Sequence, residues 1–226
     1  MKNDLSKLIY SFLVLSFTLL LTSSCEKKLT DIDGNIYKTV KIGDQIWMAE
    51  NLRVTRYNNG DPIETTNPAN IDISDLVEPK FQWVFGGKEE LAATYGRLYT
   101  WYAVTDSRKI CPEGWHVITD AEWAKLYNYF GGKSVAGGKL KEAGTVDWAH
   151  PNTDASNSSG FTARPGGGRG SNGAFGGINY YAAWWGTVEK DSLVAGYWHL
   201  YYNTSALKRT DFHKNSGFSV RCVRDL

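Results

Sequence analysis

The chain has 226 residues, a formal net charge of +1 at pH 7 and an aromatic content of 14%. This near-neutral balance excludes the strongly basic surface of domains that bind nucleic acids or anionic lipids. The first 24 residues carry Lys2, Lys7 and Asp4, so the remaining 202 (226 minus 24) are formally neutral. That length is enough for one hydrophobic core.

The N-terminal segment has the three parts of a secretory signal. A short basic start is followed by an apolar run over residues 8–21 and by small polar residues at 22–24. The apolar run is shorter than the ~20 residues that cross a bilayer as a helix, which argues against a spanning anchor. The sequence Leu-Thr-Ser-Ser-Cys resembles a bacterial lipobox, although Thr22 stands where Leu is usual. We expect residues 1–24 to be a lipoprotein signal peptide and Cys25 to carry the lipid. An ordinary signal peptide that ends near a cysteine is the alternative.

Residues 25–30 are expected to form a short polar tether, and residues 31–226 the globular domain. If Cys25 is lipidated, Cys111 and Cys222 remain. Two distant cysteines in an exported chain most simply form one disulfide, and two buried free thiols are the alternative.

The first predicted elements are strands. Turn signals at Asp33-Gly34-Asn35 and Gly43-Asp44 enclose the alternating, β-branched residues 36–42, and residues 45–48 follow as the second strand of a hairpin. Residues 31–35 resemble a calcium loop, but their glycine is at the fourth position and not the sixth, so a turn is the better interpretation. Residues 53–80 are polar with scattered Pro and Asn, which indicates a long surface excursion, and residues 81–85 favour a short strand.

The middle of the chain predicts helices. Residues 89–104 are partly helical in pattern, with Leu98, Trp101 and Tyr102 spaced to share a face. Thr119 and Glu122 form a capping-box pattern, and the apolar stripe that follows predicts a helix over residues 120–130, ended by two glycines. Residues 139–143 are expected to form a further helical turn.

The last third combines glycine-rich and β-rich sequence. Residues 160–177 contain eight glycines and a formal G-x-G-x-x-G, but no strand pattern precedes it and no helix pattern follows, so a dinucleotide site is not supported. We expect this stretch to be a loop whose turns need positive φ. Residues 179–188, 196–202 and 217–224 are predicted strands.

Four blocks of sequence resemble a known family. They are Tyr-Lys-Thr-Val-Lys-Ile-Gly-Asp-Gln-Ile-Trp-Met-Ala-Glu-Asn-Leu at 37–52, Tyr-Gly-Arg-Leu-Tyr-Thr-Trp-Tyr-Ala-Val at 95–104, Cys-Pro-Glu-Gly-Trp-His at 111–116 with Thr-Asp-Ala-Glu-Trp at 119–123, and Gly-Phe-Ser-Val-Arg-Cys-Val-Arg-Asp at 217–225. In this order they resemble the Fibrobacter succinogenes major paralogous domain, typical of exported lipoproteins in Bacteroidetes and Fibrobacteres, and the resemblance covers nearly all of the mature chain.

The resemblance implies a fold but no activity. Family members look like distant relatives of C-type lectin-like domains and of the formylglycine-generating enzyme group. The implied fold is α+β and C-type lectin-like, with a terminal β-hairpin, two helices and a long glycine-rich loop region. It also implies a disulfide between Cys111 and Cys222, which ties the helical region to the last strand.

A non-catalytic binding or adhesion module, with a glycan as one expected ligand, is the function that the sequence favours. Sugar sites need ring faces and planar polar groups. The glycine-rich segment and the loop before it provide such candidates: Trp148, Asn152, Asp154, Asn157, Arg164 and Arg169. The Glu-Pro-Asn and Trp-Asn-Asp motifs of calcium-dependent sugar-binding lectins are missing, and the four histidines lack metal-ligand spacing. We therefore expect no metal and no cofactor.

Two other functions stay open. The first is an enzyme related to the formylglycine-generating group, although that chemistry needs a closely spaced cysteine pair that the sequence lacks. The second is a structural surface protein that recognises protein partners. In each case the expected location is the cell envelope, as an outer-membrane lipoprotein held by a lipid anchor, with no nucleic-acid partner.

Overall fold

Short strands dominate residues 28–226, which are the residues that the computed structural model describes; Cys25 and the predicted signal peptide lie outside them. The strands are β1 (Leu29–Thr30), β2 (Ile36–Tyr37), β3 (Thr39–Ile42), β4 (Gln45–Met48), β5 (Gln82–Trp83), β6 (Leu98–Thr100), β7 (His116–Val117), β8 (Gly166–Arg169), β9 (Phe175–Ile178), β10 (Tyr181–Glu189), β11 (Val194–Tyr201), β12 (Leu207–His213), β13 (Gly217–Phe218) and β14 (Cys222–Asp225). The helical segments are η1 (Phe85–Gly87), η2 (Glu89–Leu91), α2 (Ala92–Tyr95), α3 (Trp101–Val104), α4 (Asp120–Tyr129) and α5 (Lys133–Leu140). The predicted α+β class is confirmed.

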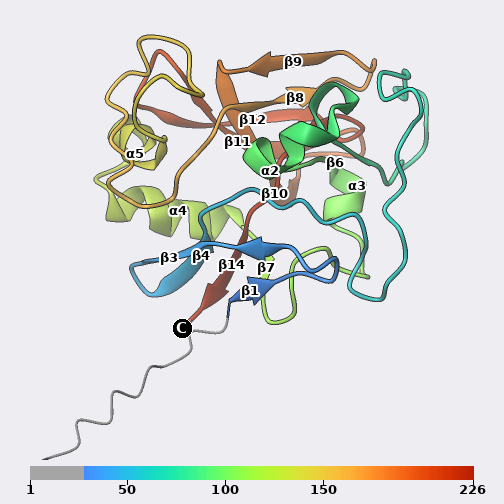
Figure 1. Ribbon diagram of the computed structural model, residues 1–226, viewed down its shortest axis with the longest axis horizontal. Coiled ribbons are helices and arrows are strands. Elements are labelled where there is room, and N and C mark those ends of the chain that lie inside the picture. Colours follow the sequence, from blue (N-terminus) through green and yellow to red (C-terminus); the bar gives the residue numbers. More distant parts are fainter. Residues whose placement is uncertain (1–27) are drawn as a thin grey trace, which may run out of the picture.

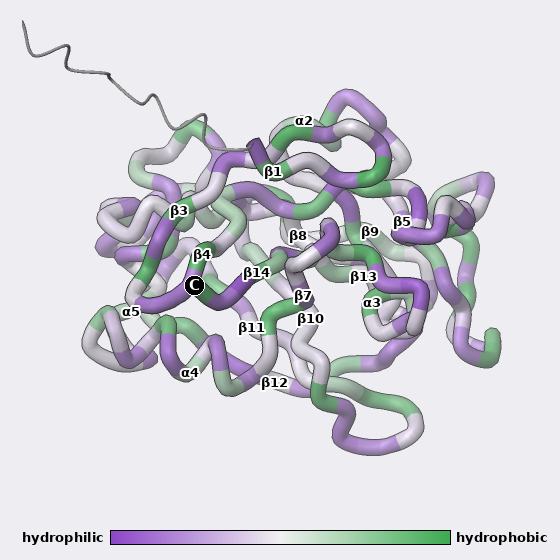
Figure 2. Tube along the Cα trace, turned by 90° about the horizontal axis from the view of Figure 1, so that it is seen from below, coloured by the Kyte–Doolittle hydropathy of each residue, from purple (hydrophilic) through white to green (hydrophobic). Residues whose placement is uncertain are grey.

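The strands form sheets of mixed chain order. The sheet orders are β1-β2, β3-β4-β14-β7, β5-β6-β13-β8-β9 and β10-β11-β12. The last strand, β14, pairs antiparallel with β4, with Val223 opposite Trp47. Both ends of the domain therefore lie together: β1, β14 and the C terminus share one side of the molecule, while β8 and β9 lie on the opposite side (Figure 1). Figure 2 views the molecule from the side of β1 and the C terminus.

The predicted early hairpin is confirmed as β3 and β4, joined through Gly43 at φ +62. The predicted first strand is divided, however, because β2 pairs with β1 and not with β4. The Asp31 carboxylate accepts hydrogen bonds from the backbone N–H groups of Asp33 and Asn35, at 3.0 and 2.9 Å, which confirms a turn. The first strand, β1, begins at Leu29, inside the range predicted as a tether.

Helix α4 begins where its cap predicts. Thr119 accepts a hydrogen bond from the N–H of Glu122, and the Glu122 carboxylate accepts one from the N–H of Thr119, which completes the capping box. Trp123 and Leu126 are buried on the inner face, while Tyr127 and Phe130 are half-buried. The helix, its N-cap and its apolar face are thus confirmed.

Two other helical predictions were wrong in part. Leu98 lies in β6, between the single turns α2 and α3. Of the helical turn predicted at 139–143, only residues 139 and 140 are helical, and they end a longer helix, α5. Gly137 and Gly138 have low helix propensity, but packing requires them. A Cβ atom at Gly137 would lie 2.6 Å from a Leu200 methyl group, and one at Gly138 would lie 2.7 Å from the Asp154 carbonyl oxygen.

The glycine-rich segment is not only loop, because β8 and β9 pair within it. Aromatic rings explain two of these glycines: a Cβ atom at Gly168 would lie 2.7 Å from the Phe218 ring, and one at Gly177 would lie 1.7 Å from the Tyr181 ring. Missing side chains therefore let rings pack directly on the strand backbone. One late strand, β12, was not predicted, because its sequence is largely polar.

Two buried clusters form the interior. One holds the tryptophans that the sequence placed on late strands, Trp184 and Trp198, together with Trp47, Trp123 and Trp148. The other surrounds the cysteines and includes Trp185, Tyr99 and Phe218. Both clusters are thus built around large aromatic rings, with aliphatic side chains packed between them.

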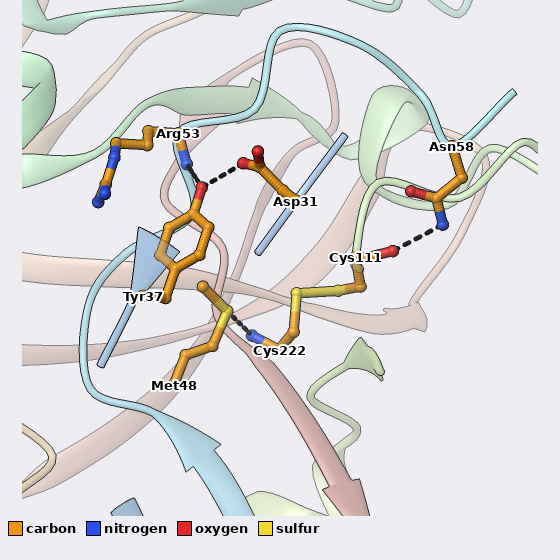
Figure 3. The surroundings of a disulfide bond; sticks show 7 residues. All are labelled: Asp31, Tyr37, Met48, Arg53, Asn58, Cys111 and Cys222. Atoms are coloured by element: carbon orange, nitrogen blue, oxygen red, sulfur yellow. Dashed lines mark hydrogen bonds between the residues drawn. A yellow bond between two sulfur atoms is a disulfide. The ribbon is translucent and has the colours of Figure 1, made fainter. Parts of the chain in front are cut away.

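The disulfide that the family resemblance implied, Cys111–Cys222, is confirmed (Figure 3). It joins residues 111 positions apart, with their Cα atoms at 5.9 Å, and both half-cystines are buried. The Asn58 side-chain amide donates to the Cys111 carbonyl at 2.7 Å, and the Cys222 N–H donates to the Met48 sulfur at 3.3 Å. The bond connects the 105–115 loop to β14.

Long loops are held by buried polar side chains that bind main-chain carbonyl oxygens, which we call carbonyl clamps. Lys141 donates to the carbonyls of residues 153, 201 and 204 at 2.9, 3.2 and 3.0 Å. Arg221 donates to the carbonyls of residues 48, 161 and 162 and to Asn51, while Asn215 donates to those of 73, 74 and 76. Burial lowers the pKa of Lys141 to about 8 and that of Arg221 to about 9. Most of the clamped carbonyl groups lie in loops, and the clamps provide their hydrogen-bond donors.

His199 on β11 is expected to make the domain acid-sensitive. It is 6% exposed, and burial, reinforced by the charge of Lys208, lowers its pKa from 6.5 to about 4. The unfolded chain therefore binds more protons between these pH values, so stability present above pH 6.5 is lost as the pH falls toward 4. At about 1.4 kcal/mol per pKa unit, the loss is about 3 kcal/mol.

Urea unfolding of wild type and His199→Gln at pH 7 and pH 4.5 measures this effect. The variant removes the titrating ring, so its stability should fall less between the two pH values. An equal fall in both proteins would assign the acid sensitivity to the carboxylates.

Candidate functional site

Two of the residues predicted to form a recognition surface are structural. Trp148 is 2% exposed, and its indole N–H donates to the Ala163 carbonyl at 2.9 Å, so its ring faces contact protein and not solvent. The buried Asn152 amide donates to the carbonyls of Glu142 and Gly144. The prediction that these side chains bind a ligand was wrong, because both are used to fold the loop that carries them.

Of the other loop candidates, Asn157 and Arg164 bind other residues of the chain, and Asp154 is exposed by itself. The Asn157 side chain bonds to the N–H and hydroxyl of Thr162, at 2.8 and 3.0 Å. Arg164 is half-buried and forms ion pairs with Glu142 at 2.9 Å and Asp147 at 3.4 Å. Asp154 is exposed. No stacking face accompanies these groups, so the structure does not assemble the predicted surface.

Arg169 lies inside the protein but shapes a groove. It is 1% exposed and stacks on Trp83, with its guanidinium carbon 4.0 Å from the ring centroid. It is a further carbonyl clamp, donating to the carbonyls of residues 69, 71 and 170. Burial lowers the pKa of Arg169 to about 10, which Asp72 partly opposes, so the group stays charged at neutral pH. Arg169 thereby fastens the 65–71 loop beside the glycine-rich segment.

The groove beside this loop is the candidate site, and we call it the amide groove. Its volume is about 800 Å³, within the usual range for ligand sites. It lies between the 65–70 loop, the η1 segment and the turn before β9. Its lining residues are Thr65, Thr66, Asn67, Pro68, Ala69, Asn70, Trp83, Val84, Gly86, Gly87, Glu89, Gly173, Ala174 and Phe175.

Gly173 brings two walls of the amide groove into close contact. Its φ is +87, and a Cβ atom there would lie 2.0 Å from the carbonyl oxygen of Asn70. Only glycine combines this backbone conformation with this approach. The glycine-rich segment therefore contributes to the site through its shape, at residues 173–175, and not through the polar side chains that the sequence suggested.

The amide groove offers neutral hydrogen-bonding groups beside an aromatic ring. Asn67 and Asn70 are exposed in the lining and form no side-chain hydrogen bond with residues 28–226, so each amide can donate to and accept from a ligand. Phe175 is half-buried and packs edge-to-face on Phe85, with ring centroids 5.5 Å apart. The one carboxylate in the lining, Glu89, is paired with Arg97. The arrangement suits an uncharged, polyhydroxylated ligand.

His116 is engaged with the residue that caps α4. The imidazole of His116 lies 2.5 Å from the Glu122 carboxylate, which also caps α4. Residues 28–226 contain no group of three or more His, Cys, Asp or Glu side chains placed to hold a metal ion. In the same range, no helix has the length and apolarity needed to cross a membrane.

The sequence contained only an indirect signal for the amide groove. Asn67-Pro-Ala-Asn70 lies in the predicted surface excursion, and its composition indicates only a loop. Its position against residues 173–175 depends on the Arg169 clamp, which spans about a hundred residues and leaves no local pattern.

A comparison with family models matches residues 40–224 to the Fibrobacter succinogenes major domain. No curated protein and no solved structure matches the chain. The matched range includes all but the first residue of the β3–β4 hairpin, the capped helix, both half-cystines of the disulfide and the whole amide groove. The chain therefore belongs to the Fibrobacter succinogenes major domain family.

Proposed function

We propose that this protein is an exported, lipid-anchored recognition module that binds a neutral carbohydrate, without catalysis, in the amide groove. The observation that carries the proposal is the pairing of two unengaged asparagine amides with the half-buried Phe175 ring in one groove. A ring face stacks on the apolar face of a sugar, and amides bind adjacent hydroxyls in pairs. Cys111 and Cys222 share a buried disulfide, which leaves neither with a free thiol for copper binding or thiol exchange.

We also propose a relationship to C-type lectin-like domains. The β3–β4 hairpin paired with the last strand, the two longer helices α4 and α5, and the long clamped loops support it. In this architecture the loops, and not the sheets, carry recognition, which agrees with a groove built from residues 65–70, 83–89 and 173–175.

Glycan binding is tested with residues 26–226, which contain every described element, on arrays of neutral host and cell-wall oligosaccharides, followed by calorimetry with each hit. Asn67→Ala and Asn70→Ala should each weaken binding by about 2- to 10-fold, the value of a lost hydrogen bond, and Phe175→Ala should weaken it at least as much. The matched control is Asn203→Ala, an exposed asparagine in the loop between β11 and β12. Equal melting temperatures would show that all variants fold.

Two results would count against this proposal. Binding that the groove variants leave unchanged would place the site elsewhere on the domain. A complete absence of binding across the arrays would favour a structural surface protein or a protein-binding module.

Lipid attachment at Cys25 is tested separately, by growing the native host with radioactive fatty acid. Wild-type protein should be labelled and should sediment with membranes, while Cys25→Ser should be unlabelled because it lacks the acceptor thiol. The measurement is the label on the purified protein, so no control by detergent fractionation is needed. Equal labelling of both proteins would contradict lipidation at Cys25.

A further inference from the structure

The path from Cys25 to the first strand is very short. Lys28 directly precedes β1, so three peptide units separate it from Cys25, a reach of at most about 11 Å. The polar headgroup layer of one leaflet is itself roughly 5–8 Å thick. The β1 end of the domain must therefore lie against the membrane, provided that Cys25 carries the lipid as proposed above.

The surface at this end contains the one tryptophan that is not buried. Eight of the nine tryptophans are buried, and Trp115 is the ninth. It is half-buried in the 112–115 turn, between two grooves of about 570 and 690 Å³ that share this turn and Thr30. The Arg224 guanidinium lies 5.5 Å from its ring centroid. Tryptophan is enriched at membrane interfaces because its ring is apolar and its N–H is polar.

Exposed aliphatic and basic side chains surround Trp115. Ile36 is 51% exposed and lies opposite Thr30 in the β1–β2 pair, and Ile32 lines one of the two grooves. Lys28 and Arg224 line the other groove. Lys109 also borders this surface, and its acidic members are Glu113 in the turn and the buried Asp31. Apolar side chains among cations match a phospholipid headgroup layer, with its phosphates outside and acyl chains beneath.

We propose that this surface, which we call the tether face (residues 28–32, Ile36, 112–115 and Arg224), rests in the headgroup layer of the membrane that holds the anchor, with the Trp115 ring at the acyl boundary. The amide groove then lies on the side of the domain away from the bilayer, because its lining residue Phe175 belongs to β9, which is on the opposite side of the molecule from β1 and the C terminus (Figure 1). The domain is thus oriented by its own surface and not only by its lipid.

The experiment uses the chain from Cys25 onward, which retains every described element. With Cys111 and Cys222 joined, Cys25 has the single free thiol, so a maleimide lipid couples there alone. Coupled protein is placed on vesicles of phosphatidylethanolamine and phosphatidylglycerol whose acyl chains are either plain or brominated. Bromine quenches tryptophan only at contact, so brominated vesicles should reduce wild-type emission, and Trp115→Phe should lose this quenching.

The matched control moves the reporter to the far side. In the double variant Trp115→Phe with Phe175→Trp, the added ring lies in the amide groove, and brominated lipid should leave its emission unchanged. Wild-type emission that is equal in plain and brominated vesicles, or quenching of the Phe175→Trp protein, would overturn the orientation. Because chemical coupling replaces biological acylation, this outcome is independent of the fatty-acid labelling of Cys25.

Discussion

Replacing Cys111 and Cys222 together by alanine should lower the free energy of unfolding by about 4–5 kcal/mol, the value for a closed loop of this length. The disulfide closes a loop of 111 residues, so its loss frees about half of the chain in the unfolded state. The junction between the 105–115 loop and β14 should be the first part to lose its structure. The disulfide holds the Cys111 carbonyl near Asn58 and the Cys222 N–H near Met48, so these two hydrogen bonds depend on it (Figure 3).

Urea unfolding of oxidised wild type and the double variant measures this loss. Wild type reduced with dithiothreitol serves as the control, because it removes the bond without changing the sequence, and its midpoint should match that of the double variant. A variant with the same midpoint as oxidised wild type would show that the remaining contacts alone hold β14 in place.

Trp123→Ala should be the most damaging single substitution, with an expected loss of about 3–5 kcal/mol. Trp123 is 0% exposed and stacks on Trp198 with ring centroids 5.5 Å apart. It also contacts Trp184 and Phe161, at 5.7 and 6.0 Å. Removing this ring leaves a cavity between α4 and β10–β11 that large, rigid neighbours cannot fill.

Two substitutions calibrate this loss in chemical denaturation. Trp123→Phe should cost less than half as much, because it keeps a ring and removes an indole N–H that has no partner among the described residues. Thr119→Ala should cost about 1 kcal/mol, the value of an N-cap. If the Thr119 variant proves less stable than Trp123→Ala, the capping box and not the aromatic packing would dominate the stability of α4.

Local patterns predicted the elements that local chemistry determines. The β3–β4 hairpin follows from alternation and turn residues, and α4 from its cap and apolar stripe. The strands β8 and β9 were missed because a glycine-rich run has no strand pattern, while Gly168 and Gly177 make room for the rings of Phe218 and Tyr181. Helix α5 was shifted for the same reason, since Gly137 and Gly138 admit contacts from β11 and the 152–157 loop.

The candidate site was predicted less well than the fold. Trp148, Asn152 and Arg169 have the residue types of a sugar site, but residue type does not reveal whether a polar side chain faces a ligand or the chain itself. Here the buried members bind main-chain carbonyls. The residues that remain free, Asn67 and Asn70, lie in a segment with no periodic pattern, so only the three-dimensional path distinguishes them.

The carbonyl clamps give the loops of this domain an unusual freedom to diverge. The clamps bind main-chain carbonyl oxygens, which every amino acid has; the clamp residues are Lys141, Arg169, Asn215 and Arg221. Each clamp therefore fixes the path of a loop without restricting the side chains of that loop. A chain that keeps these four residues could exchange Asn67 or Asn70 for other side chains and retain the same groove walls. Such a frame separates the part of the sequence that specifies shape from the part that specifies ligand, and paralogous copies could then recognise different ligands on a shared backbone.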